Sequence, residues 1–181
     1  MSKEMSSPTR YRDPIAEARR QWTAHGWSQA APGMAAVTTI TRVQQIMASR
    51  VEVALAPLGL TFARFEILRL LGFSRKGRLP MGKISDRLQV HPASVTSAVK
   101  RLEREGLMTR HTDEVDNRIV LAGVTPRGRE ILVPATEAVN GVFESIELDE
   151  SGVDALIDLL NPIRDAAGDH VETPAETDVR D

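Results

Sequence analysis

Apolar residues return every three or four positions between residues 34 and 58, and few charged residues interrupt them. This spacing is the period of one face of an α-helix. Pro57 and Gly59 close the stretch, and both residue types end helices. The pattern predicts one long amphipathic helix, and its low charge indicates that it packs against more than its own monomer.

Start and stop signals predict one further helix before the long one and one after it. Asp13 followed by Pro14 is typical of a helix N-terminus, and Gly26 marks the end of this first helix. A loop is expected at residues 30–33. Thr61 is predicted to cap the third helix, which ends near residue 72.

The segment from Met81 to Val124 predicts two short helices followed by two strands. A break at residues 90–91 separates the helices, and Gly106 ends the second of them. Residues 107–111 and 118–124 have the composition of strands, and the turn-forming sequence DEVDN joins them. Helix, turn, helix and hairpin in this order are typical of a winged helix-turn-helix.

The remaining residues predict two C-terminal helices. Thr125 and Pro126 form a start signal, and apolar positions then continue toward Glu147 with a kink expected at Pro134. Asp149 is predicted to cap the last helix.

Together these elements predict a mainly α fold with a small β-hairpin wing, in which N- and C-terminal helices flank a winged helix-turn-helix. The expected organisation is a disordered tail (1–12), N-terminal helices (13–60), a winged helix-turn-helix lobe (61–124), C-terminal helices (125–168) and an acidic disordered tail (169–181).

Composition excludes several classes of protein. The chain of 181 residues has 41% hydrophobic residues, enough for a core, and no cysteine. Disulfides, zinc ribbons, thiol nucleophiles and cysteine-based redox sensing are therefore ruled out. The apolar runs are far shorter than the ~20 residues of a membrane span, and the first residues lack the apolar core of a secretory signal. We therefore expect a cytoplasmic protein without a membrane partner.

Catalysis has no support in the sequence. The four histidines are scattered, and neither a Ser-His-Asp order, a phosphate-binding loop nor metal-ligand spacing occurs. The acidic residues at 113, 114 and 116 lack the spacing of a calcium loop. We expect no enzyme activity, no cofactor and no metal site.

The net charge of −2 conceals a division of charge along the chain. Residues 61–130 carry 14 Lys and Arg against 8 Asp and Glu, and include the basic loop expected at residues 74–80. Residues 131–181 carry 2 against 13, and residues 1–60 carry 7 against 4. A basic central segment is expected of a DNA-binding lobe, although a solvated charged face has the same composition.

The second short helix and the hairpin tip have the residues that DNA recognition needs. Val95, Val99 and Leu102 would hold the helix to the lobe, which leaves small hydroxyls, Lys and Arg on its outer face for the major groove. At the tip, Asp116 could orient Arg118 by a charge-assisted hydrogen bond, so that the long cation enters the minor groove. A surface ion pair without a function is the alternative.

The stretch from Leu60 to Ile131 resembles the multiple antibiotic resistance regulator (MarR) family. The matching segments are LTFARFEILRLL, KISDRLQVHPASVTSAVKRLEREGLMTR, the DNR of the hairpin tip and VTPRGREIL. These motifs are specific jointly rather than singly. The resemblance implies a homodimer, joined by its terminal helices, that binds a pseudo-palindromic operator. It also implies a transcriptional repressor that a small phenolic or aromatic ligand releases.

The resemblance further implies which residues contact DNA. They are Ser94, Thr96, Ser97, Lys100 and Arg101 for the major groove, Asp116 and Arg118 for the wing, and Arg110 and Lys83 for phosphates.

A short Trp-bearing helix ahead of the long one resembles the urate-responsive subgroup of this family. That subgroup also has an arginine in the recognition helix, where this chain has Ala98. Without this charge partner for an anionic purine, a different effector is favoured. The candidate effector residues are Trp22, His25, Trp27, Arg64 and Glu66. Simple packing or surface ion pairing is the alternative for each of them.

A second hypothesis remains open, namely a winged-helix module that mediates protein contacts without a ligand response. The polar outer face of the second short helix and Arg118 argue against it. DNA binding that depends on Arg118 would distinguish the two hypotheses.

Overall fold

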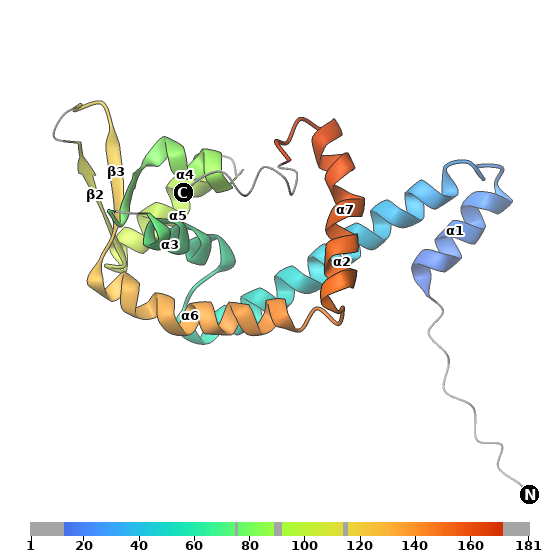
Figure 1. Cartoon of the computed structure of the whole chain (residues 1–181), viewed down its shortest axis with the longest axis horizontal. Helices are drawn as coiled ribbons and strands as arrows, with labels where there is room; N and C mark the ends of the chain where they lie inside the picture. The colour runs from blue at the N-terminus through green and yellow to red at the C-terminus, as the bar shows by residue number, and fades with distance from the viewer. Residues whose placement is uncertain (1–12, 75, 89–91, 114–115, 172–181) are drawn as a thin grey trace, which may run out of the picture. The chain divides into compact units, whose positions relative to one another are not determined.

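The computed structural model describes residues 13–74, 76–88, 92–113 and 116–171, in a mainly helical fold (Figure 1). Its elements are α1 (Pro14–Ala24), α2 (Ala31–Leu55), the 3-10 helix η1 (Ala56–Leu58), α3 (Phe62–Phe73), β1 (Arg78–Pro80), α4 (Met81–Leu88), α5 (Pro92–Arg104), β2 (Met108–Thr112), β3 (Val120–Val124), α6 (Pro126–Glu144) and α7 (Glu150–Ala166). The chain divides into two units at residue 143, and each is described by itself.

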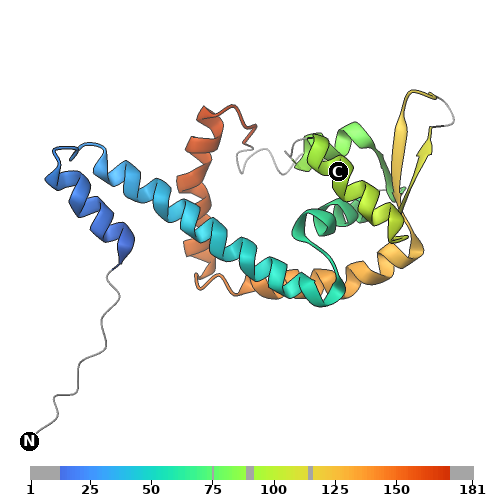
Figure 2. The ribbon, with the colours of Figure 1, turned by 180° about the vertical axis from the view of Figure 1, so that it is seen from behind.

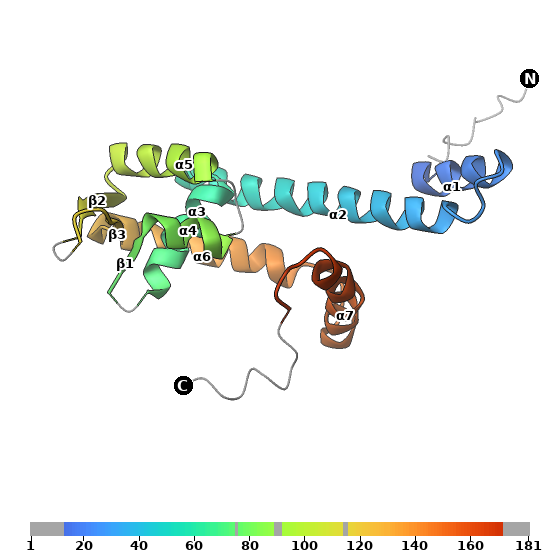
Figure 3. The same cartoon turned by 90° about the horizontal axis from the view of Figure 1, so that it is seen from above.

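Helices α1 and α2 form an antiparallel pair (Figure 3). The carboxylate of Asp13 accepts hydrogen bonds from the amides of Ile15 and Ala16, as a cap should. Gly26 has a φ of +87°, which lets the chain turn toward α2. The expected loop at residues 30–33 is wrong in its last three residues, because α2 already begins at Ala31 and Pro32 stands in its first turn, where no amide hydrogen is needed.

The start of α3 is capped differently from the prediction. Thr61 stands at the cap position, but its hydroxyl makes no hydrogen bond to the amides of the first turn. Instead, Oε1 of Glu52 accepts from the amide of Phe62 at 3.0 Å. Glu52 belongs to α2, so the long helix supplies the cap of the helix that follows it. Figure 2 shows α2 running from α1 to the start of α3.

The wing is a three-stranded antiparallel sheet in the order β1-β3-β2. Arg78 pairs with Gly123, and Met108 pairs with Val124. The predicted loop at residues 74–80 is therefore wrong in its last three residues, which form the edge strand β1. A strand of three residues that includes Pro80 shows no alternation of apolar and polar positions, and proline is compatible with an edge.

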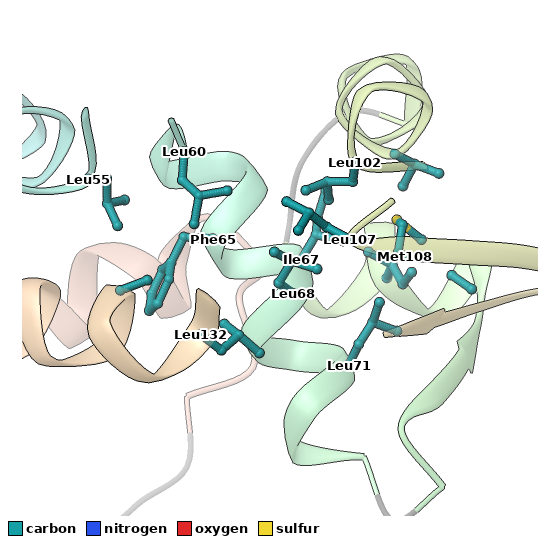
Figure 4. Close-up of a cluster of buried hydrophobic side chains, with 14 of the residues drawn as sticks. Leu55, Leu60, Phe65, Ile67, Leu68, Leu71, Leu102, Leu107, Met108 and Leu132 are labelled. Carbon is teal, nitrogen blue, oxygen red and sulfur yellow. The ribbon is translucent and has the colours of Figure 1, made fainter. Parts of the chain in front are cut away.

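Helix α3 lies at the centre of the hydrophobic core (Figure 4). Ile67, Leu68 and Leu71 are fully buried, and Leu102 of α5 and Met108 of β2 belong to the same cluster. The core therefore holds α5 and the start of β2 on one support, α3.

The junction between the wing and α6 is tightly packed. The hydroxyl of Thr125 donates to the carbonyl of Gly106 and accepts from the amide of Gly128, which confirms the predicted cap. The Thr125 amide donates to the carbonyl of Leu107 at 3.1 Å. Gly128 is buried against this carbonyl, without room for a Cβ.

Helices α6 and α7 differ from the prediction mainly in where α6 ends. It continues through Pro134 but stops at Glu144, and Glu147 has a left-handed φ of +64°, which no helix tolerates. Asp149 caps α7 by accepting from the amide of Gly152 at 2.8 Å.

Helices α2 and α7 each expose large apolar side chains. They are Val37, Ile40, Val43, Ile46 and Val53 in α2, and Leu156, Ile157, Leu159 and Ile163 in α7. Exposed large apolar side chains that gather on one helix can mark a site of association. No described helix is both long and apolar enough to cross a membrane.

Candidate nucleic-acid interface

Helix α5 has one buried face and one exposed face. Val95, Val99 and Leu102 follow one another by four and three residues, and each is at most 2% exposed. The side chains predicted to face the major groove lie on the exposed side of the helix: Thr96, Ser97, Lys100 and Arg101. The side chain of Ser94 and the break predicted at residues 90–91 lie outside the described residues. The helix thus presents hydroxyls and cations together, and such groups bind phosphates and base edges.

The tip of the wing presents one cation. Arg118 is 89% exposed in its side chain and forms a two-pronged contact with Asp116, with Nε–Oδ1 at 3.0 Å and Nη2–Oδ2 at 2.9 Å. The amide of Arg118 also donates to Oδ1. These hydrogen bonds lower the pKa of Asp116 and raise that of Arg118. The pair therefore stays ionised at neutral pH and orients the guanidinium, as the sequence predicted.

The two predicted phosphate contacts have different surroundings. Arg110 on β2 donates twice to Oε2 of Glu103 on α5, at 2.6 and 2.9 Å, and this contact lowers the pKa of Glu103. Arg110 therefore links β2 to α5, and its residue is also exposed to solvent. Lys83 is exposed on α4.

Arg64 is the one buried charged residue among those that the structure describes. Its Nη1 lies 2.7 Å from Oε2 of Glu105, while Nη2 donates to the carbonyl of Gly59 and Nε to the hydroxyl of Thr61. Oε1 of Glu105 accepts in turn from Nε of Arg101 at 2.9 Å. Sequence reasoning missed this network. Its signal was the position of Arg64, four residues after the buried Leu60 and three before the buried Ile67.

Three of the effector candidates form one aromatic cluster at the turn between α1 and α2. The rings of Trp22 and Trp27 meet edge to face, with their centroids 5.4 Å apart. The ring of His25 stacks on that of Trp27, with the centroids 5.9 Å apart. Nδ1 of His25 lies 2.8 Å from the carbonyl of Gln21. Both tryptophans remain exposed. The turn therefore exposes aromatic side chains to solvent.

The other two candidates lie at the opposite end of α2, on α3 (Figure 1). The length of α2 separates the two groups by roughly 35 Å within one chain. Glu66 is half-buried, and this burial raises its pKa. Ala98 is half-buried against the core. One chain therefore does not bring all five candidates together.

A hollow of about 520 Å³ opens between the start of α1 and the middle of α2. None of the five effector candidates lines it. The described residues contain no cluster of His, Cys, Asp and Glu that could hold a metal ion.

Comparisons with known proteins agree on one family. Residues 60–120 match the MarR family. The chain is 33% identical over 98 residues to the HTH-type transcriptional repressor Rv2887 of Mycobacterium tuberculosis, an alignment that spans 54% of this chain and 68% of that protein.

Solved structures give the same result over a longer stretch. The MarR family transcriptional regulator Sco5413 of Streptomyces coelicolor is 44% identical, with a TM-score of 0.70, over 78% of this chain and 99% of that one. CouR of Rhodococcus jostii RHA1, bound to p-coumaroyl-CoA, is 25% identical with a TM-score of 0.62, over 74% of this chain and 93% of its own.

Proposed function

Because the chain belongs to the MarR family of DNA-binding transcriptional regulators, we propose that it is a cytoplasmic repressor. It binds a pseudo-palindromic operator as a homodimer, and a small aromatic ligand releases it. The family is one of regulators rather than enzymes.

Arg118 carries the proposal for DNA. It is a long, exposed cation at the end of a hairpin, and the Asp116 carboxylate fixes its direction. Such a side chain fits the narrow minor groove, where negative potential is concentrated. The exposed face of α5, with Ser97, Lys100 and Arg101, enters the adjacent major groove. Lys83 and Arg110 contact phosphates beside it.

The exposed apolar faces of α2 and α7 support the homodimer. Helices with this much uncovered apolar surface associate in water, and two copies related by a two-fold axis cover the same patches on each other. A two-fold dimer in turn reads an operator with two-fold symmetry.

The aromatic cluster at the α1–α2 turn supports an aromatic ligand. Trp22 and Trp27 offer ring faces beside His25, whose imidazole can bind an acidic group. CouR, a relative of the same fold, was solved with a p-coumaroyl thioester. Urate is not favoured, since Ala98 supplies no cation.

Replacing Arg118 with alanine tests the DNA contact. We expect operator affinity to fall about tenfold or more, because each dimer loses two minor-groove cations. Fluorescence anisotropy on DNA from upstream of the chain's own gene measures it. The turn survives the change, because Asp116 still accepts from the amide of residue 118. Arg20→Ala in α1 removes one equal charge from an exposed ion pair and serves as the control. Equal binding by wild type and Arg118→Ala would contradict the proposal.

A thermal-shift titration with p-coumarate tests the aromatic ligand. We expect the melting temperature to rise with ligand concentration and the operator complex to dissociate. Trp27→Ala, which removes the ring that contacts both other aromatic groups, should abolish both effects. A melting temperature that p-coumarate and related aromatic acids leave unchanged would reject ligand release at this cluster.

A further inference from the structure

Glu105 is shared between two arginines of different kinds. One oxygen binds Arg64, whose side chain is 7% exposed, and the other binds Arg101, whose side chain is 58% exposed. Glu105 follows directly after the last residue of α5, and its own side chain is 31% exposed. A single carboxylate thus links a buried arginine of α3 to an exposed arginine of α5.

We propose that Arg64 is a positioning residue for DNA recognition: it neutralises Glu105, so that Arg101 can leave this carboxylate for the DNA. This inference rests on the proposed function, in which Arg101 faces the major groove. Arg64 itself contacts no DNA.

The argument follows from the charges at the end of α5. When Arg101 turns toward a phosphate or a guanine, its contact with Glu105 breaks. Arg64 cannot leave with it, because the carbonyl of Gly59 and the hydroxyl of Thr61 hold the same guanidinium in the lobe. The carboxylate that stays behind is therefore still paired. Arg101 loses only an exposed i,i+4 ion pair, which is a weak interaction.

Without Arg64 the same carboxylate would act against DNA binding. Among the described residues, Arg101 would then be the one cation paired with Glu105, and Glu105 would hold Arg101 more strongly. When Arg101 did leave, an unpaired negative charge would remain close to the phosphate backbone. Both effects lower affinity, and both act through charge rather than through shape.

The link also reaches the dimerisation helix. Gly59 ends η1, directly after α2, and has a φ of +67°. Glu52 of α2 caps α3, the helix that bears Arg64. The cation that neutralises Glu105 is therefore held at the junction of α2 and α3. The conformation at the end of α2 thus affects how readily Arg101 leaves Glu105 to bind DNA.

A set of four variants tests the proposal: Arg64→Met, Arg64→Lys, Glu105→Gln and the double variant Arg64→Met with Glu105→Gln. Operator affinity is measured by anisotropy at several KCl concentrations, and folding is checked by urea unfolding. We expect Arg64→Met to bind on the order of tenfold more weakly, with a salt dependence reduced by about one phosphate contact per protomer. Arg64→Lys keeps the charge but not the forked geometry, and should keep the wild-type salt dependence.

The double variant separates charge from structure. It lacks the same buried hydrogen bonds as Arg64→Met, but it also lacks the carboxylate, so its affinity should return to at least the wild-type value. Glu105→Gln alone should bind more tightly than wild type. A double variant as weak as Arg64→Met, or Arg64→Met with unchanged affinity, would overturn the proposal. If Arg64→Met does not fold, Glu105→Gln decides alone, and affinity no tighter than wild type would overturn it.

Failure of this inference is distinguishable from failure of the proposed function. A wild-type chain that binds no operator contradicts the function. A wild-type chain that binds, and that Arg118→Ala weakens while Arg64→Met does not, contradicts only the role of Arg64.

Discussion

Alanine at position 128 is expected to lower the free energy of unfolding by about 3 kcal/mol. Gly128 is buried in the first turn of α6, and a Cβ there would run into the carbonyl oxygen of Leu107 and the side chain of Val124. The carbonyl cannot move aside, because it accepts the amide of Thr125. The Gly128 amide is itself bound to the Thr125 hydroxyl, which fixes the turn from the other side. The added methyl group therefore has to separate the wing from α6.

Urea unfolding or calorimetry measures this effect, and the melting temperature should fall by roughly 6–12 °C. The matched control is Gly141→Ala in the same helix, where a Cβ meets no atom within 4 Å. That change should raise stability by about 0.5–1 kcal/mol, since glycine is a poor helix former. If Gly128→Ala were as stable as Gly141→Ala, the close packing that we describe between the wing and α6 at Gly128 would be contradicted.

Removal of the Glu105 side chain is expected to cost about 3 kcal/mol of stability. Glu105→Ala leaves the guanidinium of Arg64 buried without its counter-ion, and breaking a buried ion pair from one side is costly. We place the loss at the lower end of the range for buried pairs, because Glu105 is 31% exposed and water screens part of the interaction.

Glu103→Ala is the control for this prediction. Glu103 lies two residues earlier and also binds an arginine, but both partners of its pair with Arg110 are about one-third exposed. Its removal should therefore cost clearly less in the same urea unfolding experiment. Equal losses for the two variants would mean that burial of Arg64 does not determine the effect.

Sequence patterns predicted the helices well, because most of their starts and ends depend on local chemistry. Asp13, Thr125 and Asp149 cap their own helices, and Gly26 and Gly106 adopt the positive φ that a stop requires. Each of these residues acts within a few positions of itself, so a single sequence contains the whole signal.

Several of the errors arose where the decisive partner is distant in sequence. The cap of α3 comes from Glu52, ten residues before the amide that it binds. Strand β1 exists because β3, more than forty residues later, pairs with it. The pairing of Arg64 with Glu105 spans 41 residues. Periodicity places such residues on a face but does not identify what they meet there.

The candidate site divides in the same way. The exposure of Lys100 and Arg101 follows from the helical spacing of Val95, Val99 and Leu102, and the Asp116–Arg118 contact is local. Within one copy of the chain, α2 separates the α1–α2 turn from Glu66, so a contact between them would have to form in the homodimer that we propose. No spacing within a single sequence determines that contact.

The hydrogen bonds of Thr125 have a consequence for how operators and regulators diverge. They bind the residue after β3 to Gly106 and Leu107, which directly precede β2. Both ends of the hairpin are therefore held together at the base of the wing. Insertions, deletions or substitutions at the tip then leave the core undisturbed, as they do at other exposed loop tips. Under the function that we propose, relatives can therefore change their operator preference by substitutions at the wing tip without loss of the fold.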